Sequence, residues 1–249
     1  MLNRAANVGG DPAEIVKARG RSVLSSAFTN SSIFLTSGLR LNIGVSAQHF
    51  SLNNNYSIEP RMAITQNIGE KHTLGLAYGL HSRIERLYLY YNNSLSTGEK
   101  AVNKNMGFTK AHHFVLSYDW NITDIIHLKV EPYFQQLYNV PVMEGTSLSA
   151  VNFQSDWFFA EKMVNKGEGR NYGLDITLEK YMSNGFYYMA TTSIFESKYK
   201  GGDGVWRDSR FNRNYVVNLL AGKEWKVGKN HQKSFEINGG IKFQGGVSV

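Results

Sequence analysis

The chain has 249 residues and a formal net charge of +7, but Lys and Arg are scattered without a basic helix or stripe, so we expect no nucleic-acid partner. It contains no cysteine, which excludes disulfides and thiolate metal sites. A mean hydropathy of −0.34 and the lack of an apolar run of about 18 residues exclude a transmembrane helix, yet both are compatible with a transmembrane β-barrel, whose strands turn half their side chains to a polar lumen.

The N-terminal residues show no regular alternation. We expect residues 1–21 to be a loop remnant or one short helical turn, with Asp11 as N-cap and Pro12 as the first helical residue. This stretch lacks the basic segment and the apolar segment of a signal peptide. Because a barrel has to be exported, we expect the chain to be a fragment of a longer protein.

Three strands are expected in the first quarter of the chain. A weak strand runs from Arg21 to Thr29 and ends in a turn at residues 30–32. The second strand alternates apolar and polar residues from Leu39 onwards, which is the period-two pattern of a strand. The third strand follows the asparagines at 53–55 and contains Pro60. Because proline has no N–H for the ladder, we expect a bulge there.

The middle of the chain continues the alternation. A turn at residues 69–71 leads to a fourth strand at 73–81, and a long polar segment follows from about residue 85 to 110. The next hairpin turns at residues 121–124. Its return strand has these polar or aromatic residues on one face: His127, Lys129, Glu131, Tyr133 and Gln135. Such a face requires water, which a barrel lumen supplies.

The clearest hairpin lies between Tyr172 and Tyr199. Leu174, Ile176 and Leu178 alternate with polar residues, and Asn184-Gly185 supplies a tight turn because both residues accept positive φ. Aromatic residues at this turn are typical of an interfacial girdle: Tyr181, Phe186, Tyr187 and Tyr188. After a further segment at 200–213, the last two strands turn at 229–232.

These segments make about ten strands, and the connections between them alternate in length. Short turns fall at one end of the strands and long loops at the other, with the short loop at 53–55 as the one exception. This asymmetry is typical of outer-membrane barrels, whose short turns are periplasmic. The sequence therefore predicts an all-β fold. We expect residues 22–249 to be a partial antiparallel barrel domain that contacts outer-membrane lipid.

Seven segments resemble, in this order, the C-terminal half of the barrel of TonB-dependent outer-membrane receptors. The closest similarity is to receptors with a carboxypeptidase-regulatory-like domain. The segments are YSIEPRMAI, LGLAYGLHSRI, NKNMGFTKAHHFVLSYDW, EPYFQQLYNVPV, GEGRNYGLDITLEKYMSNGFYY, SIFESKYKGGDGVWR and FNRNYVVNLLAGKEW. The resemblance implies a 22-stranded barrel around a plug domain and uptake of a bulky nutrient powered by TonB. The plug domain, the TonB-contacting region and the remaining strands are not in this sequence.

Candidate binding residues lie in the long loops. Trp157 and Phe158 in the second loop, and Trp206 and Arg207 in the third, are aromatic and arginine side chains of the kind that anchor ligands. Their alternative role is to pack the loops against each other or against a plug. We expect no metal site and no cofactor, since adjacent His112 and His113 would point to opposite faces of a strand.

Two other functions remain open. A complete ten-stranded outer-membrane enzyme similar to the omptin proteases would need acidic residues and a histidine at the loop end, for which His81, Asp203 and Asp208 are the only candidates. A soluble lipid-binding barrel would place apolar residues inside and polar residues outside. For the receptor fragment we expect no catalytic centre and an open, curved sheet, because ten strands would crowd the long charged side chains of the lumen face.

Overall fold

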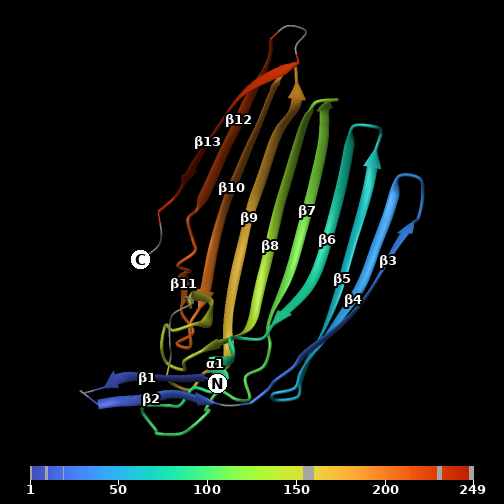
Figure 1. Ribbon diagram of the computed structural model, residues 1–249. Coiled ribbons are helices and arrows are strands. Elements are labelled where there is room, and N and C mark those ends of the chain that lie inside the picture. The colour runs from blue at the N-terminus through green and yellow to red at the C-terminus, as the bar shows by residue number, and fades with distance from the viewer. Residues whose placement is uncertain (1, 9–10, 19, 154–159, 229–231, 247–249) are drawn as a thin grey trace.

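The computed structural model describes residues 2–8, 11–18, 20–153, 160–228 and 232–246. Ten long strands form one antiparallel sheet, in which successive long strands lie side by side (Figure 1). The long strands are β3 (Leu24–Phe34), β4 (Leu39–Phe50), β5 (Asn55–Ile68), β6 (His72–Arg83), β7 (Thr109–Thr123), β8 (Ile126–Val142), β9 (Val164–Ser183), β10 (Phe186–Lys200), β12 (Tyr215–Val227) and β13 (Lys233–Gln244). A short strand, β11 (Trp206–Asp208), pairs with β10 alone.

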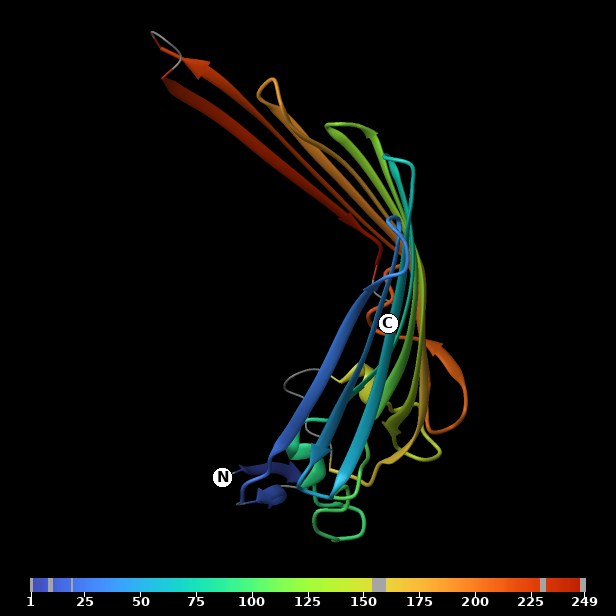
Figure 2. The same cartoon turned by 90° about the vertical axis from the view of Figure 1, so that its right-hand side faces the viewer.

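The sheet is curved and open (Figure 2). Its strand order runs from β3 at one edge to β13 at the other, and within the described ranges these two strands do not pair. Every residue of both edge strands is exposed to solvent. The expectation of an open, curved sheet is confirmed. None of the described helices is long and apolar enough to cross a membrane.

The two faces of the sheet differ in polarity. On the convex face, apolar side chains stand exposed along every central strand, among them Leu76 on β6, Leu116 on β7, Ile194 on β10 and Leu219 on β12. On the concave face, Gln135, Asn171 and Asp175 line a hollow. An apolar outside and a polar inside are the arrangement of a membrane barrel. This finding contradicts the soluble lipid-binding barrel.

The two ends of the sheet also differ, as the sequence predicted. Short turns join the strands at the upper end in Figure 1, and all connections at the lower end are long loops except the one between β4 and β5; β1 and β2 also lie at this end. Asn184 and Gly185 have φ values of 52° and 69°, so this two-residue turn has the backbone that Asn-Gly favours.

The long loops pack into a hydrophobic cluster at their end of the sheet. Phe50 at the end of β4 meets Tyr90 of the single-turn helix α1 (Leu87–Tyr90) edge to face, with ring centroids 5.3 Å apart. Desolvation by burial raises the pKa of Tyr90 to about 12. Further buried members are Ile15, Val16, Tyr88, Leu89, Met106, Phe108, Val140, Ala150 and Met163. This packing gives the loop layer a fixed shape.

The expectation of a loop or a helical turn at the N-terminus was wrong. Leu2–Val8 (β1) and Asp11–Ala18 (β2) form a separate two-stranded sheet. Strand β2 is held by the first long loop, since Asn93 donates its backbone N–H to the Ile15 carbonyl at 2.8 Å. The buried side chains of Ile15 and Val16 join the loop cluster. These long-range contacts outweigh the local capping signal at Asp11.

Three further details differ from the sequence prediction. Residues 30–32 belong to β3, and the reversal lies at 35–38, where the Thr36 hydroxyl accepts the N–H groups of Gly38 and Leu39. Pro60 causes no bulge, because the register of β4 with β5 is continuous through it. Tyr187 leaves the expected girdle, since its hydroxyl donates to Asn238 Oδ1 on the concave face.

Candidate functional site

A hollow of about 520 Å³ lies in the concave face, next to the loop layer. Strands β7 to β10 form its wall, and Val151 and Phe211 reach it from the second and third long loops. A second hollow, of about 360 Å³, adjoins it over β4 to β7 and shares His113 and Val115 with it. The two hollows make a continuous depression along the inner wall.

A row of polar side chains crosses this wall at one level. The register aligns Arg61 on β5 with Gly79 on β6, and the row continues through the following strands as His113, Gln135, Asn171 and Ser197. Residues aligned in register share a face of the sheet, so the row presents its hydrogen-bonding groups to the hollows. We call these residues the polar row.

Hydrogen bonds connect the polar row from strand to strand. Asn171 Nδ2 donates to Gln135 Oε1 at 2.9 Å, and Gln135 Nε2 lies 3.3 Å from His113 Nδ1. At the β10 end, the hydroxyls of Ser197 and Ser209 lie 2.6 Å apart. These bonds hold the amides in fixed orientations, so the wall presents preorganised donors and acceptors.

The histidine next to the row depends on a glycine. The rings of His81 and His113 have centroids 4.6 Å apart. A Cβ at Gly79 would lie 2.7 Å from His81 Nε2, so a larger residue at this position would displace the imidazole from its present place. No group of three or more His, Asp or Glu side chains in the described part of the chain could hold a metal ion.

Two further rows follow towards the short turns. The first contains Tyr133, Gly173 and Phe195, and Gly173 leaves room for its neighbours because its Cβ would lie 2.8 Å from the Tyr133 hydroxyl. The second contains Asp175 on β9 opposite Glu131 on β8. From the loops towards the short turns, successive rows of the wall are therefore neutral and polar, then aromatic, then acidic.

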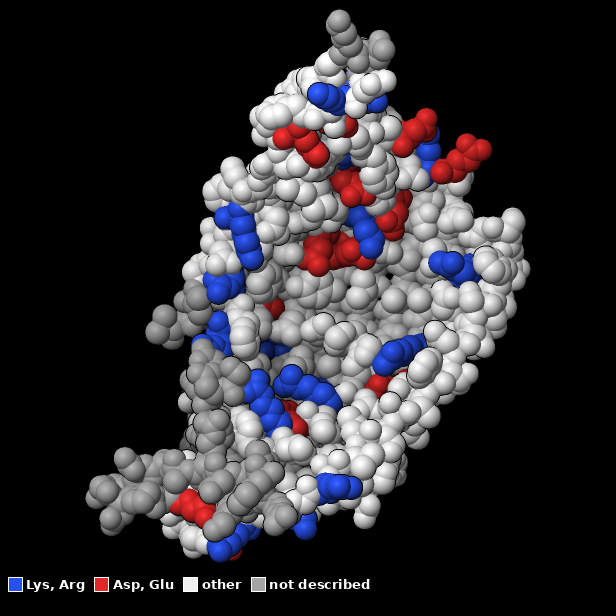
Figure 3. Space-filling model, viewed as in Figure 1, with Lys and Arg blue, Asp and Glu red and all other residues white. Residues whose placement is uncertain are grey.

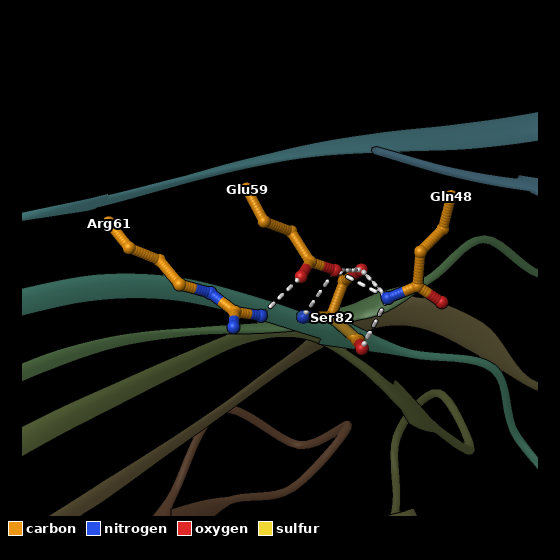
Figure 4. Close-up of polar contacts among 4 residues, drawn as sticks. All are labelled: Gln48, Glu59, Arg61 and Ser82. Carbon is orange, nitrogen blue, oxygen red and sulfur yellow. Dashed lines mark hydrogen bonds and ion pairs between the residues drawn. The ribbon is translucent and has the colours of Figure 1, made fainter. Parts of the chain in front are cut away.

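A buried carboxylate joins three strands beside the second hollow (Figure 4). Glu59 is 1% exposed, and its Oε1 accepts hydrogen bonds from Gln48 Nε2 at 2.5 Å and from the Ser82 backbone N–H at 3.1 Å. Its Oε2 lies 3.1 Å from Arg61 Nη2. The ladder between β5 and β6 ends at Arg61, next to Pro60. The carboxylate thus accepts the backbone N–H of Ser82 on β6 at the point where β5, next to Pro60, no longer pairs with β6.

The concave face carries acidic side chains in its half towards the short turns (Figure 3). His127 lies between Asp119 at 3.3 Å and Glu179 at 3.7 Å, and Lys129 Nζ is 2.8 Å from Glu131. This half of the wall is acidic although the chain as a whole is basic.

No family model and no curated relative matches the chain. Several solved structures share its fold. They include FpvA of Pseudomonas aeruginosa in complex with heterologous pyoverdines, with 11% identity and a TM-score of 0.64 over 97% of this chain and 33% of that one. The ferric-catecholate import receptor Fiu of E. coli K12 has 10% identity and a TM-score of 0.63 over 88% and 38%. The alcaligin outer-membrane receptor FauA of Bordetella pertussis has 13% identity and a TM-score of 0.59 over 90% and 37%.

The sheet has the fold of an outer-membrane receptor barrel. It spans about one third of the length of the receptors that it matches. The concave face of this barrel segment corresponds to the inner wall, and the convex face to the outer wall.

Of the sequence-predicted binding residues, the structure describes Trp206 and Arg207, which lie away from the two hollows. Trp157 and Phe158 fall outside the described residues. Trp206 lies on β11, which stands on the convex side of the barrel segment in Figure 2, and the Arg170 guanidinium lies 4.4 Å from its ring centroid. Arg207 donates to both carboxylate oxygens of Asp203, at 3.0 and 2.7 Å. The role of Trp206 and Arg207 in binding stays a prediction.

The residues considered for an enzyme do not form a site. His81 lies on β6, whereas Asp203 and Asp208 lie in the connection that contains β11, with four strands of the sheet between them. Arg207 also lowers the pKa of Asp203 to about 2 through its hydrogen bonds. This separation contradicts the proposed catalytic set. The polar row was not predicted from the sequence, because only the register of the strands brings its members together.

Proposed function

We propose that this chain forms part of the barrel of a TonB-dependent outer-membrane receptor that takes up a bulky nutrient. The observation that carries the proposal is the double asymmetry of the sheet: apolar outside and polar inside, with short turns at one end and packed loops at the other. The fold of the solved receptors supports it. In this proposal the chain forms part of the barrel wall, contributes to the specificity for the ligand and has no catalytic centre.

The open edges fit such a role. Backbone groups along β3 and β13 have no strand partner on their outer sides in the described structure, and lipid cannot satisfy them. We propose that the other strands of a barrel of about 22 strands pair with them. A plug domain would fill the lumen, and TonB would contact the receptor through a region outside this sequence.

The nutrient would first meet the loop layer and then the polar row. The larger hollow borders the loop layer, because Val151 and Phe211 extend from the loops into it, and the second hollow adjoins the larger one. We propose that the ligand contacts the polar row after it passes the loops. Trp206 and Arg207 would contribute at the outer rim of the loop layer.

Accessibility on intact cells tests this orientation. Single cysteines at the exposed loop residue Thr97 and at the short-turn residue Asn184 are introduced into the full-length receptor and treated with an impermeant thiol reagent. The proposal requires labelling at Thr97 and protection at Asn184, because the short turns are periplasmic. This chain has no native cysteine to interfere. The opposite pattern would reject the orientation, and labelling at neither position would reject the outer-membrane location.

A further inference from the structure

We propose that the larger hollow binds a portion of the nutrient that carries no negative charge. In this inference, which rests on the proposed receptor function, the neutral groups of the polar row hold hydrogen-bonding groups of the ligand. The rings of Tyr133 and Phe195 contact its apolar face. We infer this class of ligand from the side chains of the wall, because a shared fold does not identify a ligand.

The lining offers many neutral hydrogen-bonding groups. Gln135 and Asn171 contribute amides, and Ser197 and Tyr133 contribute hydroxyls. Beside them lie apolar and aromatic side chains: Val115, Leu137, Val151, Phe195 and Phe211. Amides and hydroxyls next to an aromatic surface suit an uncharged ligand with polar edges and apolar faces.

The cations described on this part of the wall are each paired with a carboxylate. Lys198 is the only Lys or Arg among the lining residues, but it alternates with Ser197, so its side chain lies on the convex face of β10, where its Nζ is 2.8 Å from Glu196. Arg61 in the neighbouring hollow is paired with Glu59, and Lys129 is paired with Glu131. These carboxylates offset the positive charge that an anionic ligand would otherwise meet.

The acidic side of the hollow adds repulsion. The Asp175 carboxylate accepts a hydrogen bond from the Ser193 hydroxyl at 2.6 Å. In the described ranges no Lys or Arg nitrogen lies within ion-pair distance of this carboxylate. Asp119 and Glu179 both lie within ion-pair distance of His127 and, in the described ranges, of no Lys or Arg. A ligand with several negative charges would approach carboxylates that no described Lys or Arg offsets, and the repulsion between like charges costs binding free energy.

The ligand class proposed for this chain does not come from the solved receptors whose fold the chain shares. Among those, Fiu imports ferric catecholates and FpvA is seen with pyoverdines, as their structures describe. A shared barrel fold does not carry the ligand class, because function depends on the side chains placed on the fold. Here those side chains select against an anionic chelate.

A cysteine in the hollow measures its charge preference without a known ligand. Val115→Cys is introduced into the purified full-length receptor, because Val115 lines both hollows and this chain has no other cysteine. Its rates of reaction with a positively and a negatively charged methanethiosulfonate are each divided by the rates at Thr97→Cys in the exposed loop. We expect the positive reagent to be favoured by about threefold or more at ~0.1 M salt, and the preference to fall as salt is added.

Two variants of one residue assign the preference to charge. Asp175→Asn keeps the size and the hydrogen bond to Ser193 and should reduce the preference, whereas Asp175→Glu should retain it. Glu196→Gln, on the opposite face, should leave it unchanged. An equal or reversed ratio at Val115→Cys, an unreactive cysteine, or no response to Asp175→Asn would each overturn the inference.

The test is independent of the orientation on cells. If Thr97→Cys is protected on intact cells while the purified protein keeps the charge preference, the proposed receptor function fails and the charge preference of the hollow stands. If labelling on cells follows the proposed orientation and the preference is missing, only the ligand class is wrong.

Discussion

The Glu59 carboxylate accepts the backbone N–H of Ser82 at 3.1 Å, across the point where β5 and β6 stop pairing. Pro60 has no backbone N–H to donate to a neighbouring strand. The side chain of Glu59 accepts the Ser82 N–H, which has no β5 backbone partner beyond the end of the ladder. A local defect in the sheet is thereby turned into a cross-link between β4, β5 and β6, next to a hollow that opens to the lumen.

The first prediction concerns this cross-link. Glu59→Ala removes the acceptor of the Ser82 N–H, the closest acceptor of the Gln48 amide and the partner of Arg61, so it should lower the free energy of unfolding by about 2–4 kcal/mol. Glu59→Gln keeps an acceptor and should cost about 1 kcal/mol. Urea unfolding of the full-length receptor from lipid vesicles measures both values. The matched control is Glu196→Gln, which removes an exposed ion pair. Equal losses for Glu59→Ala and this control would contradict the buried role.

The second prediction tests the two faces. Arg in place of Leu174, Ile176, Leu128 or Leu219 would put a charge into lipid on the convex face, and each change should cost about 2–4 kcal/mol near the bilayer midplane. Thr177→Arg on the concave face should cost little, because water is present there. Folding into lipid vesicles at several urea concentrations gives these free energies. The assignment of faces would be lost if Thr177→Arg were as costly as Ile176→Arg.

The third prediction concerns a contact between two loops. Gly145 donates its N–H to the Gly202 carbonyl at 3.1 Å, and a Cβ at Gly202 would lie 1.9 Å from the Met143 carbonyl oxygen. Gly202→Ala must therefore separate the second and third long loops. Limited proteolysis should cut these loops several times faster in the variant. Gly20→Ala is the control, since a Cβ there meets nothing within 4 Å. Unchanged proteolysis at Gly202→Ala would show that the loops do not pack as described.

The fourth prediction is a pH dependence of the third loop. Hydrogen bonds from Arg207 lower the pKa of Asp203 from 3.8 to about 2. A carboxyl whose pKa is lower in the folded loop stabilises it above pH 3.8, and this contribution is lost as the pH falls through about 2. Hydrogen exchange of residues 201–208 should therefore speed up over this range, relative to the intrinsic rate. In Asp203→Asn this acid-dependent change should disappear, and its persistence there would assign it to another group.

Alternation alone predicted which side chains of each strand share a face. Leu174 and Asp175 point to opposite sides because successive residues of a strand do so, whatever their partners are. Register was harder to predict. Counting back from the turn at Asn184-Gly185 would pair Asp175 with Ile194, but an irregularity between Phe186 and Tyr188 shifts the partner to Ser193. Such a shift follows from the packing of both strands and leaves no mark in either sequence.

The polar row and the loop cluster show the same limit on a larger scale. His113 and Gln135 come from one hairpin, but Arg61 joins them only through β6, and the 84–108 loop hides the register of β6 with β7 from any counting argument. Phe50 and Tyr90 meet across 40 residues of sequence. The sequence predicted exposed aromatic anchors in the loops, whereas burial of apolar area draws many loop aromatics into the cluster.

The last prediction concerns the chain on its own. Strands β3 and β13 form two free edges, and the convex side of β13 exposes Phe235, Ile237, Ile241 and Phe243 at 54–58% of their surface. A long edge strand with exposed apolar residues is a template for pairing with another chain. In detergent the isolated chain should therefore form oligomers or aggregates. Lys at Ile237 and Ile241 should reduce this association, because charges on an edge strand oppose pairing. Analytical ultracentrifugation gives the mass of each species, with the same two substitutions at Leu74 and Leu76 on the central strand β6 as the control. A heat-resistant monomer with full strand content would show that the chain closes by itself, and would make a complete small barrel the better description.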